Sequence, residues 1–238
     1  MKFDIITIFP KIFDSYFVES LISRAQKKKL IKIGIHDLRK YTKDKHKKVD
    51  DSPFGGGAGM VMQVEPIYRA VTALKSKIQN PNFKSSPKSK VILFTPRGKK
   101  FDQKMATELS KQDQLIFICG RYEGVDERVA KKIADIKLSV GDYVLMGGEI
   151  PAMAVIETIT RLIPGAIGKE GLLKARITKS KGFVEYEQYT RPENFNGWKV
   201  PKVLLSGNHK KIEEWKREHS KIIVGPRPIS LGLKKLKK

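Results

Sequence analysis

Short apolar runs separated by polar and turn residues dominate the first part of the chain. The run 3–9 is interrupted only by Asp4 and Thr7 and ends at Pro10, and apolar residues alternate with other residues over 31–36. Runs of this length and period are typical of β-strands. We therefore expect two strands here, joined by a helix over 11–28.

Two further apolar runs, 91–94 and 115–118, each stop at a turn, and a helix-like segment, 102–110, lies between them. Strand, turn, helix and strand in this order are typical of an α/β fold with a mostly parallel sheet. Ligands of such sheets collect at the carboxyl ends of the strands. The turns at Thr95-Pro96, Gly120 and Gly141 are therefore expected to converge on one site.

Two of these turns are rich in glycine, 119–124 and 140–151. Glycine lets the main chain approach a ligand closely or adopt positive φ, and Tyr122 and Tyr143 offer flat walls with a polar tip. The pattern predicts a small-molecule pocket built mostly of backbone and suited to an adenosine-like ligand. A nucleotide- or NAD-dependent enzyme is a weaker reading, because the glycines at 55–59 match neither a Walker loop nor a dinucleotide fingerprint. A mobile or tightly bent loop is expected there instead.

The chain length allows one large domain or one domain with a small partner. A helix is expected over 152–162, and the stretch 163–182, with several Gly and Lys, suits an interdomain linker or lid. We thus predict a first domain over 1–162 and a small helical domain over 183–238. The polar segment 79–90 is interpreted as a surface loop.

Basic residues outnumber acidic ones, 48 to 25, which gives a formal charge of +23. An excess spread over the whole chain favours polyanions, of which nucleic acid is the commonest inside cells. The alternative is a general bias towards lysine without a partner. Charge alone does not choose between RNA and DNA.

The first residues lack the basic and long apolar regions of a signal peptide, and no transmembrane helix or membrane association is indicated. Cys119 is the only cysteine, so there is neither a disulfide framework nor a zinc-type Cys/His cluster. These features fit a cytoplasmic protein. Cys119 itself is expected to be a buried residue at a strand end, since no base lies near it in sequence.

Several short strings follow one another in order along nearly the whole chain: 49–51 (VDD), 55–62 (GGGAGMVM), 120–129 (GRYEGVDERV), 140–149 (VGDYVLMGGE), 161–165 (RLIPG), 189–192 (YTRP) and 203–209 (VLLSGNH). Together they resemble the bacterial tRNA (guanine-37-N1)-methyltransferases of the SPOUT superfamily.

The resemblance implies a deep trefoil knot in the carboxyl half of the sheet, a homodimer, and tRNA held across both subunits. S-adenosylmethionine would bind in the knot, and family members are thought to use Mg²⁺, although no metal ligands are assigned here. The positions that match the methyl-donor pocket are Thr95, Pro96, Gly120, Tyr122, Gly124, Val140, Gly141, Tyr143, Leu145, Gly147, Gly148 and Pro151.

The resemblance also assigns substrate contacts. Asp50 and Glu123 would contact the target guanine or its neighbourhood. Without the resemblance, the simpler interpretations are a loop cap for Asp50 and a surface ion pair for Glu123. Arg161 matches the arginine proposed to stabilise negative charge on guanine O6, the alternative being an ion pair or a phosphate contact. Methylation at N1 requires loss of the N1 proton, so a general base is also needed.

The chain departs from its family at that base. Arg176 or Ile177, depending on the direction of counting, occupies the position of the family aspartate, and neither accepts a proton. Another acid is one explanation, with Glu185 preferred over Glu187 and Glu170. Slow turnover without a base is a second. A tRNA-binding homologue with weak or lost catalysis is a third, against which the retained donor pocket argues.

Overall fold

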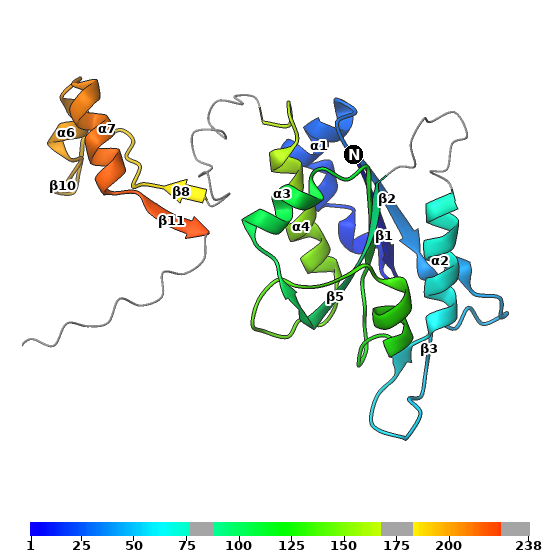
Figure 1. Ribbon diagram of the computed structural model, residues 1–238. Coiled ribbons are helices and arrows are strands. Elements are labelled where there is room, and N and C mark those ends of the chain that lie inside the picture. The colour runs from blue at the N-terminus through cyan, green and yellow to red at the C-terminus, as the bar shows by residue number, and fades with distance from the viewer. Residues whose placement is uncertain (77–87, 168–182, 225–238) are drawn as a thin grey trace, which may run out of the picture. The chain divides into compact units, whose positions relative to one another are not determined.

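The computed structural model describes residues 1–76, 88–167 and 183–224, which divide into two compact units, 1–170 and 171–238 (Figure 1). The first unit is built on a five-stranded sheet of order β2-β1-β6-β5-β7, and every neighbouring pair is parallel. Its strands are β1 (Lys2–Thr7), β2 (Lys32–Asp37), β5 (Ser89–Lys100), β6 (Gln114–Ile118) and β7 (Ile136–Ser139). The predicted α/β class with a mostly parallel sheet is confirmed.

Helices cover both faces of this sheet. Successive side chains of a strand point to opposite faces, so the apolar strands here have side chains to bury on each face. Phe3, Ile5 and Phe117 belong to the apolar cluster that includes residues of α1, α3 and α4. Ile6 and Ile116 belong to the opposite cluster, which includes residues of α2. The helices are α1 (Ser20–Lys27), α2 (Val64–Ser76), α3 (Gln103–Leu109) and α4 (Glu149–Leu162), with short helical turns η1 (Pro10–Phe13), η2 (Tyr16–Val18), η3 (Leu38–Tyr41) and η4 (Val129–Ile133).

The continuous helix expected over 11–28 is wrong. The chain instead forms the turns η1 and η2 before α1 begins at Ser20. Glu19 has extended backbone, and Ser20 has φ +53°, so the helical path is broken at these two residues. Buried Phe13 and Phe17, whose stacked rings lie 5.3 Å apart, hold the two turns in the apolar cluster.

The strand expected over 91–94 does not end at Thr95. β5 continues to Lys100, and its pairing with β7 is interrupted between Phe94 and Lys99, both of which are paired with Leu138. A Cβ at Gly98 would lie 2.5 Å from the Leu138 nitrogen, so only glycine fits this close approach. The interruption pushes the intervening residues out of the ladder at the edge of the sheet where the site lies.

A small antiparallel pair, β3 (Asp50–Asp51) and β4 (Val61–Met62), flanks the glycine-rich loop. Gly55, Gly56 and Gly59 in this loop have positive φ, as does Gly57, which makes it tightly bent. Most of the predicted surface loop 79–90 lies outside the described residues, and its last two residues already belong to β5.

The second unit is mixed rather than only helical. Its described residues, 183–224, form two antiparallel strand pairs, β8 with β11 and β9 with β10, as well as two helices. The elements are β8 (Phe183–Glu185), β9 (Asn194–Phe195), β10 (Trp198–Lys199), α6 (Lys202–Leu205), α7 (His209–Glu218) and β11 (Lys221–Val224). Of the expected linker 163–182, residues 168–182 lie outside the described residues. No helix in the described parts of the chain has both the length and the apolar character needed to cross a membrane.

Candidate active site

A cavity of about 420 Å³ is lined by the part of β5 where its pairing with β7 is interrupted and by the loops that follow β6 and β7. Its size falls in the usual range for small-molecule sites. Eleven of the twelve residues predicted for the donor pocket line it: Thr95, Pro96, Gly120, Tyr122, Gly124, Val140, Tyr143, Leu145, Gly147, Gly148 and Pro151. Three segments that are far apart in sequence therefore meet at one hollow, as predicted, but Thr95 and Pro96 lie within β5 and not in a turn after it.

Gly141, the twelfth predicted residue, does not line the cavity. It makes room for the ring of Tyr143, which does. A Cβ at Gly141 would lie 2.2 Å from the ring of Tyr143. The missing side chain thus leaves space for that ring, which lines the cavity while remaining 58% exposed. Tyr143 therefore presents a flat, accessible wall to a ligand.

The loops after β6 and β7 touch each other through their backbones. The Gly148 nitrogen donates a hydrogen bond to the Gly120 carbonyl at 3.1 Å. A Cβ at Gly148 would lie 2.6 Å from the Cα of Cys119, so a larger residue has no room. The cavity is thus a cradle of closely packed main chain, which fits the flat rings and hydrogen-bonding edges of an adenosine group.

Cys119 is fully buried at the end of β6, as expected. Burial raises the pKa of the Cys119 thiol well above its ordinary value, and the nearby negative charge of Glu149 raises it further. A thiol in this state is neutral at physiological pH and is a poor nucleophile. Covalent catalysis through Cys119 is therefore not supported.

Glu123 lies at the rim of the cavity, next to the glycine-rich loop. Its nitrogen donates to the Met60 carbonyl at 3.0 Å, and a Cβ at Gly59 would lie 2.6 Å from the Glu123 Cγ. The Glu123 side chain is exposed, and within the described residues it forms no ion pair. The surface ion pair considered for Glu123 is thus not found among the described residues.

Asp50 does not line the cavity, although it is connected to it. Asp50 pairs with Met62 across β3 and β4, and the Met62 nitrogen donates to the Gly124 carbonyl at 3.0 Å. The ladder therefore positions Asp50 relative to the turn that carries Glu123.

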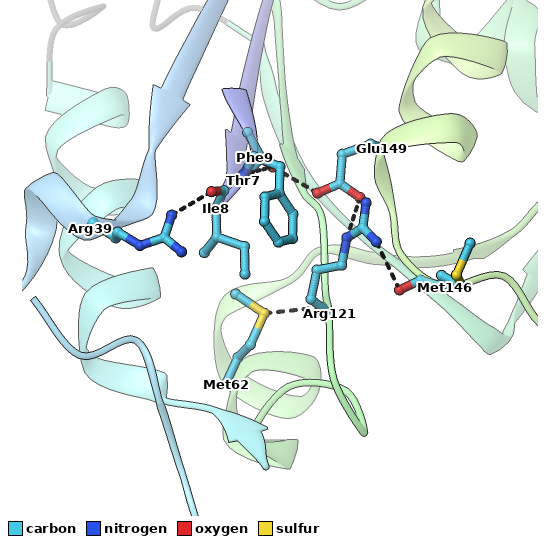
Figure 2. A network of polar contacts seen from close by, with 8 residues as sticks. All are labelled: Thr7, Ile8, Phe9, Arg39, Met62, Arg121, Met146 and Glu149. Carbon is cyan, nitrogen blue, oxygen red and sulfur yellow. Dashed lines mark hydrogen bonds and ion pairs between the residues drawn. The ribbon is translucent and has the colours of Figure 1, made fainter. Parts of the chain in front are cut away.

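A buried polar network, which was not predicted from the sequence, lies beside the cavity (Figure 2). Thr7 donates to Glu149 Oε1 at 2.7 Å, and Arg121 Nε donates to Glu149 Oε2 at 2.9 Å. Glu149 is only 1% exposed, and the Arg121 guanidinium lies over the ring of Phe9 at 4.9 Å. The network joins the ends of β1 and β6 to the start of α4.

Sequence offered a weak signal for this network. Arg121 and Glu149 both lie in the glycine-rich turns, but Thr7 and Glu149 are 142 residues apart. A buried carboxylate is expected to have a paired cation and further donors, because an unpaired charge is costly to bury. Two charged residues beside the glycines were therefore candidates for a structural pair.

Arg161 is separated from the donor cavity. It lies near the end of α4 and lines a second, mostly apolar cavity of about 390 Å³, together with Thr160, Glu157 and residues of α1. Pro151, which lines the first cavity, precedes it by ten residues in the same helix. At 1.5 Å per residue, their backbones are about 15 Å apart.

The proposed base, Glu185, belongs to the second unit, whereas the cavity is formed by residues of the first. Glu185 ends β8 in the second unit, where it is opposite Lys221 of β11. Arg176, Ile177 and Glu170 lie outside the described residues. Among the residues described, no group of three or more His, Cys, Asp or Glu side chains is placed to hold a metal ion.

A parallel α/β sheet with a cavity lined by glycine-rich loops defines an α/β protein with a small-molecule binding site. The family model for tRNA (guanine-1)-methyltransferase TrmD matches residues 1–226. The chain therefore belongs to the tRNA (guanine-1)-methyltransferase family.

Similar proteins agree with this assignment. A tRNA (guanine-N(1)-)-methyltransferase of Ruminiclostridium cellulolyticum is 50% identical over 220 residues, covering 92% of this chain and 91% of its own. The protein of that name from Clostridioides difficile is 47% identical, with 97% of each chain covered. The crystal structure of the tRNA (m1G37) methyltransferase from Aquifex aeolicus superposes with a TM-score of 0.73 at 41% identity, covering 92% of this chain and 88% of that one.

Proposed function

We propose that this protein transfers a methyl group from S-adenosylmethionine to N1 of guanine 37 in tRNA. The observation that carries the proposal is the cavity between the interrupted part of β5 and the loops after β6 and β7, lined by the glycine turns of a tRNA (guanine-1)-methyltransferase. A charge of +23 suits a polyanionic partner such as tRNA. We place the reaction in the cytoplasm, where its tRNA substrate is found.

The residues of the cavity fit the donor. The cavity wall around Gly120 and Gly148 is main chain without side chains, which lets a flat adenine ring approach closely, and the exposed ring of Tyr143 offers a stacking surface. When bound, S-adenosylmethionine supplies an electrophilic methyl group on a sulfonium centre. Arg121 and Glu149 neutralise each other beside the cavity, so together they add little net charge to a site for a cationic donor.

The protein must also stabilise the guanine as N1 loses its proton. Negative charge then moves to O6, and the Arg161 guanidinium is assigned to that oxygen. Asp50 and Glu123 are assigned to contacts with the guanine or its surroundings. The connection of β4 to the Glu123 turn supports placing both acids near one rim of the cavity.

Arg161 supports a homodimer in which each active site uses two chains. Methyl transfer requires the reacting atoms to approach to about 3 Å. A separation of about 15 Å along α4 between Pro151 and Arg161 is too long for both to serve one guanine within a single chain. In a dimer, Arg161 of one subunit can reach the donor cavity of the other.

A trefoil knot in the carboxyl half of the sheet is part of the proposal. The match to the family supports it, and so do two close backbone approaches in this half of the sheet, Gly98 to Leu138 and Gly148 to Cys119. We also assign residues 1–162 to the donor domain, 163–182 to a linker and 183–238 to a tRNA-binding domain. The Mg²⁺ that members of the family are thought to use is assigned no ligands in this chain.

The general base remains assigned to Glu185, with Glu187 and Glu170 as the other acids. A protein that only binds tRNA is not favoured, because binding alone gives no physical reason to keep the glycine cradle of the donor cavity. Slow transfer without a base is the competing enzyme mechanism, since general-base catalysis contributes about 10²- to 10⁴-fold.

The deciding experiment measures labelled methyl transfer from S-adenosylmethionine to a tRNA transcript with guanine 37, and to a transcript with that guanine replaced. Arg161→Ala is expected to lower kcat by about 10²- to 10³-fold while donor binding is retained. Glu185→Gln is expected to lower kcat by about 10²-fold or more. Unchanged kcat in Glu185→Gln would remove Glu185 as the base, and transfer by wild type that does not depend on guanine 37 would overturn the proposed function.

A further inference from the structure

A short hairpin in the second unit carries two exposed aromatic side chains on one face. Phe195 on β9 is directly opposite Trp198 on β10, and their rings are 5.8 Å apart in an edge-to-face arrangement. Phe195 is 55% exposed and Trp198 is 73% exposed. Directly opposite residues of an antiparallel pair share a face, so the two rings form one apolar surface.

The turn of this hairpin fixes that surface locally. Asn196 and Gly197 have φ of +53° and +85°, the signs required of both central residues of a type I′ turn. Asn-Gly is the favoured sequence for such a turn, and its twist matches that of the flanking strands. The aromatic pair is therefore held in place before any partner binds, which reduces the entropic cost of binding.

Trp215, Tyr189 and His219 of this unit pack against one another. Trp215 stacks on His219 at 4.1 Å, and Tyr189 meets the edge of Trp215. Across the described parts of the chain, Phe195 and Trp198 make aromatic ring contacts only with each other. Internal aromatic packing thus gives no reason for two large rings at the hairpin.

Basic side chains surround the hairpin in sequence. Arg191, Lys199 and Lys202 are exposed, and within the described residues none of them forms an ion pair. Glu193 is the single acidic residue between 191 and 202, so this segment carries three positive charges and one negative charge. A partner of this surface should therefore combine a flat apolar face with negative charge.

We propose that the surface formed by Phe195 and Trp198 stacks an unpaired base of the tRNA, while Lys199, which follows Trp198 on β10 and therefore points to the other face of the hairpin, contacts a backbone phosphate. This inference rests on the proposed function, because it takes tRNA as the substrate. Every nucleobase has a π-face, and aromatic side chains combined with cations are the usual means of holding unpaired nucleotides. The hairpin is thereby a tRNA contact separate from the methyl-donor cavity.

The test uses the full-length protein and four variants, with tRNA affinity measured from 50 to 200 mM salt. Trp198→Ala is expected to weaken tRNA binding about tenfold without changing the slope of log Kd against log salt. Lys199→Ala is expected to reduce that slope by about one, as for the loss of one phosphate contact. Trp198→Phe keeps an aromatic ring and should restore most of the affinity. Tyr68→Ala, which removes an exposed aromatic from α2, serves as the matched control.

Fluorescence gives a second readout. Trp198 and Trp215 are the two tryptophans, so emission that tRNA quenches in wild type but not in Trp198→Phe reports on Trp198. Unchanged affinity in Trp198→Ala, with no quenching of Trp198, would overturn the hairpin proposal while wild-type methyl transfer still supported the enzyme. Loss of the dimer in Trp198→Ala would also overturn it, in favour of a protein occupant. If Trp198→Ala binds tRNA more weakly but the wild type transfers no methyl group, the hairpin proposal stands and the proposed methyltransferase function is rejected.

Discussion

At the scale of single residues, Asp4 makes the clearest link between charge and stability. Its side chain is buried, and it accepts hydrogen bonds from Gln114 and Lys2 on one oxygen and contacts His36 on the other. Burial by itself would raise the pKa of Asp4, but the bonds from these three side chains outweigh it and hold the pKa below its usual range. The ionised carboxylate is therefore favoured by folding.

The direction of the pH dependence follows from this lowered pKa. Stability contributed by Asp4 is fully present above the pKa of an unfolded aspartate, about 3.9, and is lost as pH falls through the lower folded pKa. Asp4→Asn should lower the free energy of unfolding by about 1–3 kcal/mol at pH 7. Urea unfolding at pH 7 and at pH 3 should find a smaller difference at the acidic value. Exposed Asp14→Asn is the control, and an equal Asp4→Asn effect at both pH values would contradict the role of the charge.

At the scale of elements, the contact between the loops after β6 and β7 depends on one missing side chain. Gly148→Ala would place a Cβ 2.6 Å from the Cys119 Cα, which is backbone and cannot rotate away. We expect a loss of about 1–3 kcal/mol in the free energy of unfolding, together with weaker binding of S-adenosylmethionine.

Gly120→Ala is the matched control for that change. It lies in the same cavity, but its Cβ would meet only the Val125 side chain, at 3.3 Å. Denaturant unfolding should therefore find a clearly smaller loss than for Gly148→Ala. Equal losses for the two variants would mean that the loop contact does not limit stability.

Some of the secondary-structure elements could be predicted from the sequence and others could not. β1, β2 and β6 follow from apolar runs, and the converging glycine turns follow from where those runs stop. The break at Ser20 and the continuation of β5 beyond Thr95 do not follow, because the first depends on local packing and the second on pairing with β7 about 40 residues later. The pairing of Thr7 with Glu149 likewise exists only once β1 and α4 are brought together.

At the scale of the whole molecule, the separation of Arg161 from the donor cavity limits how an active site can be assembled. The sequence motif placed both in one functional set, yet α4 carries them about 15 Å apart. If two subunits share each site, defects in the two parts should complement each other. Gly120→Val fills the donor cavity of one chain, and Arg161→Ala removes the guanidinium from the other.

Heterodimers of these two variants, co-expressed with different tags and purified through both, would contain one site with two defects and one intact site. We expect about half of the wild-type methyl transfer per dimer, whereas each variant homodimer should be nearly inactive. The control is a heterodimer of wild type with the doubly altered chain, in which every shared site carries one defect. If the sites are shared, this control should have almost no activity. If each site lies within one chain, the control should keep about half of the activity, because the wild-type chain has an intact site of its own. The heterodimer of the two single variants should then be nearly inactive.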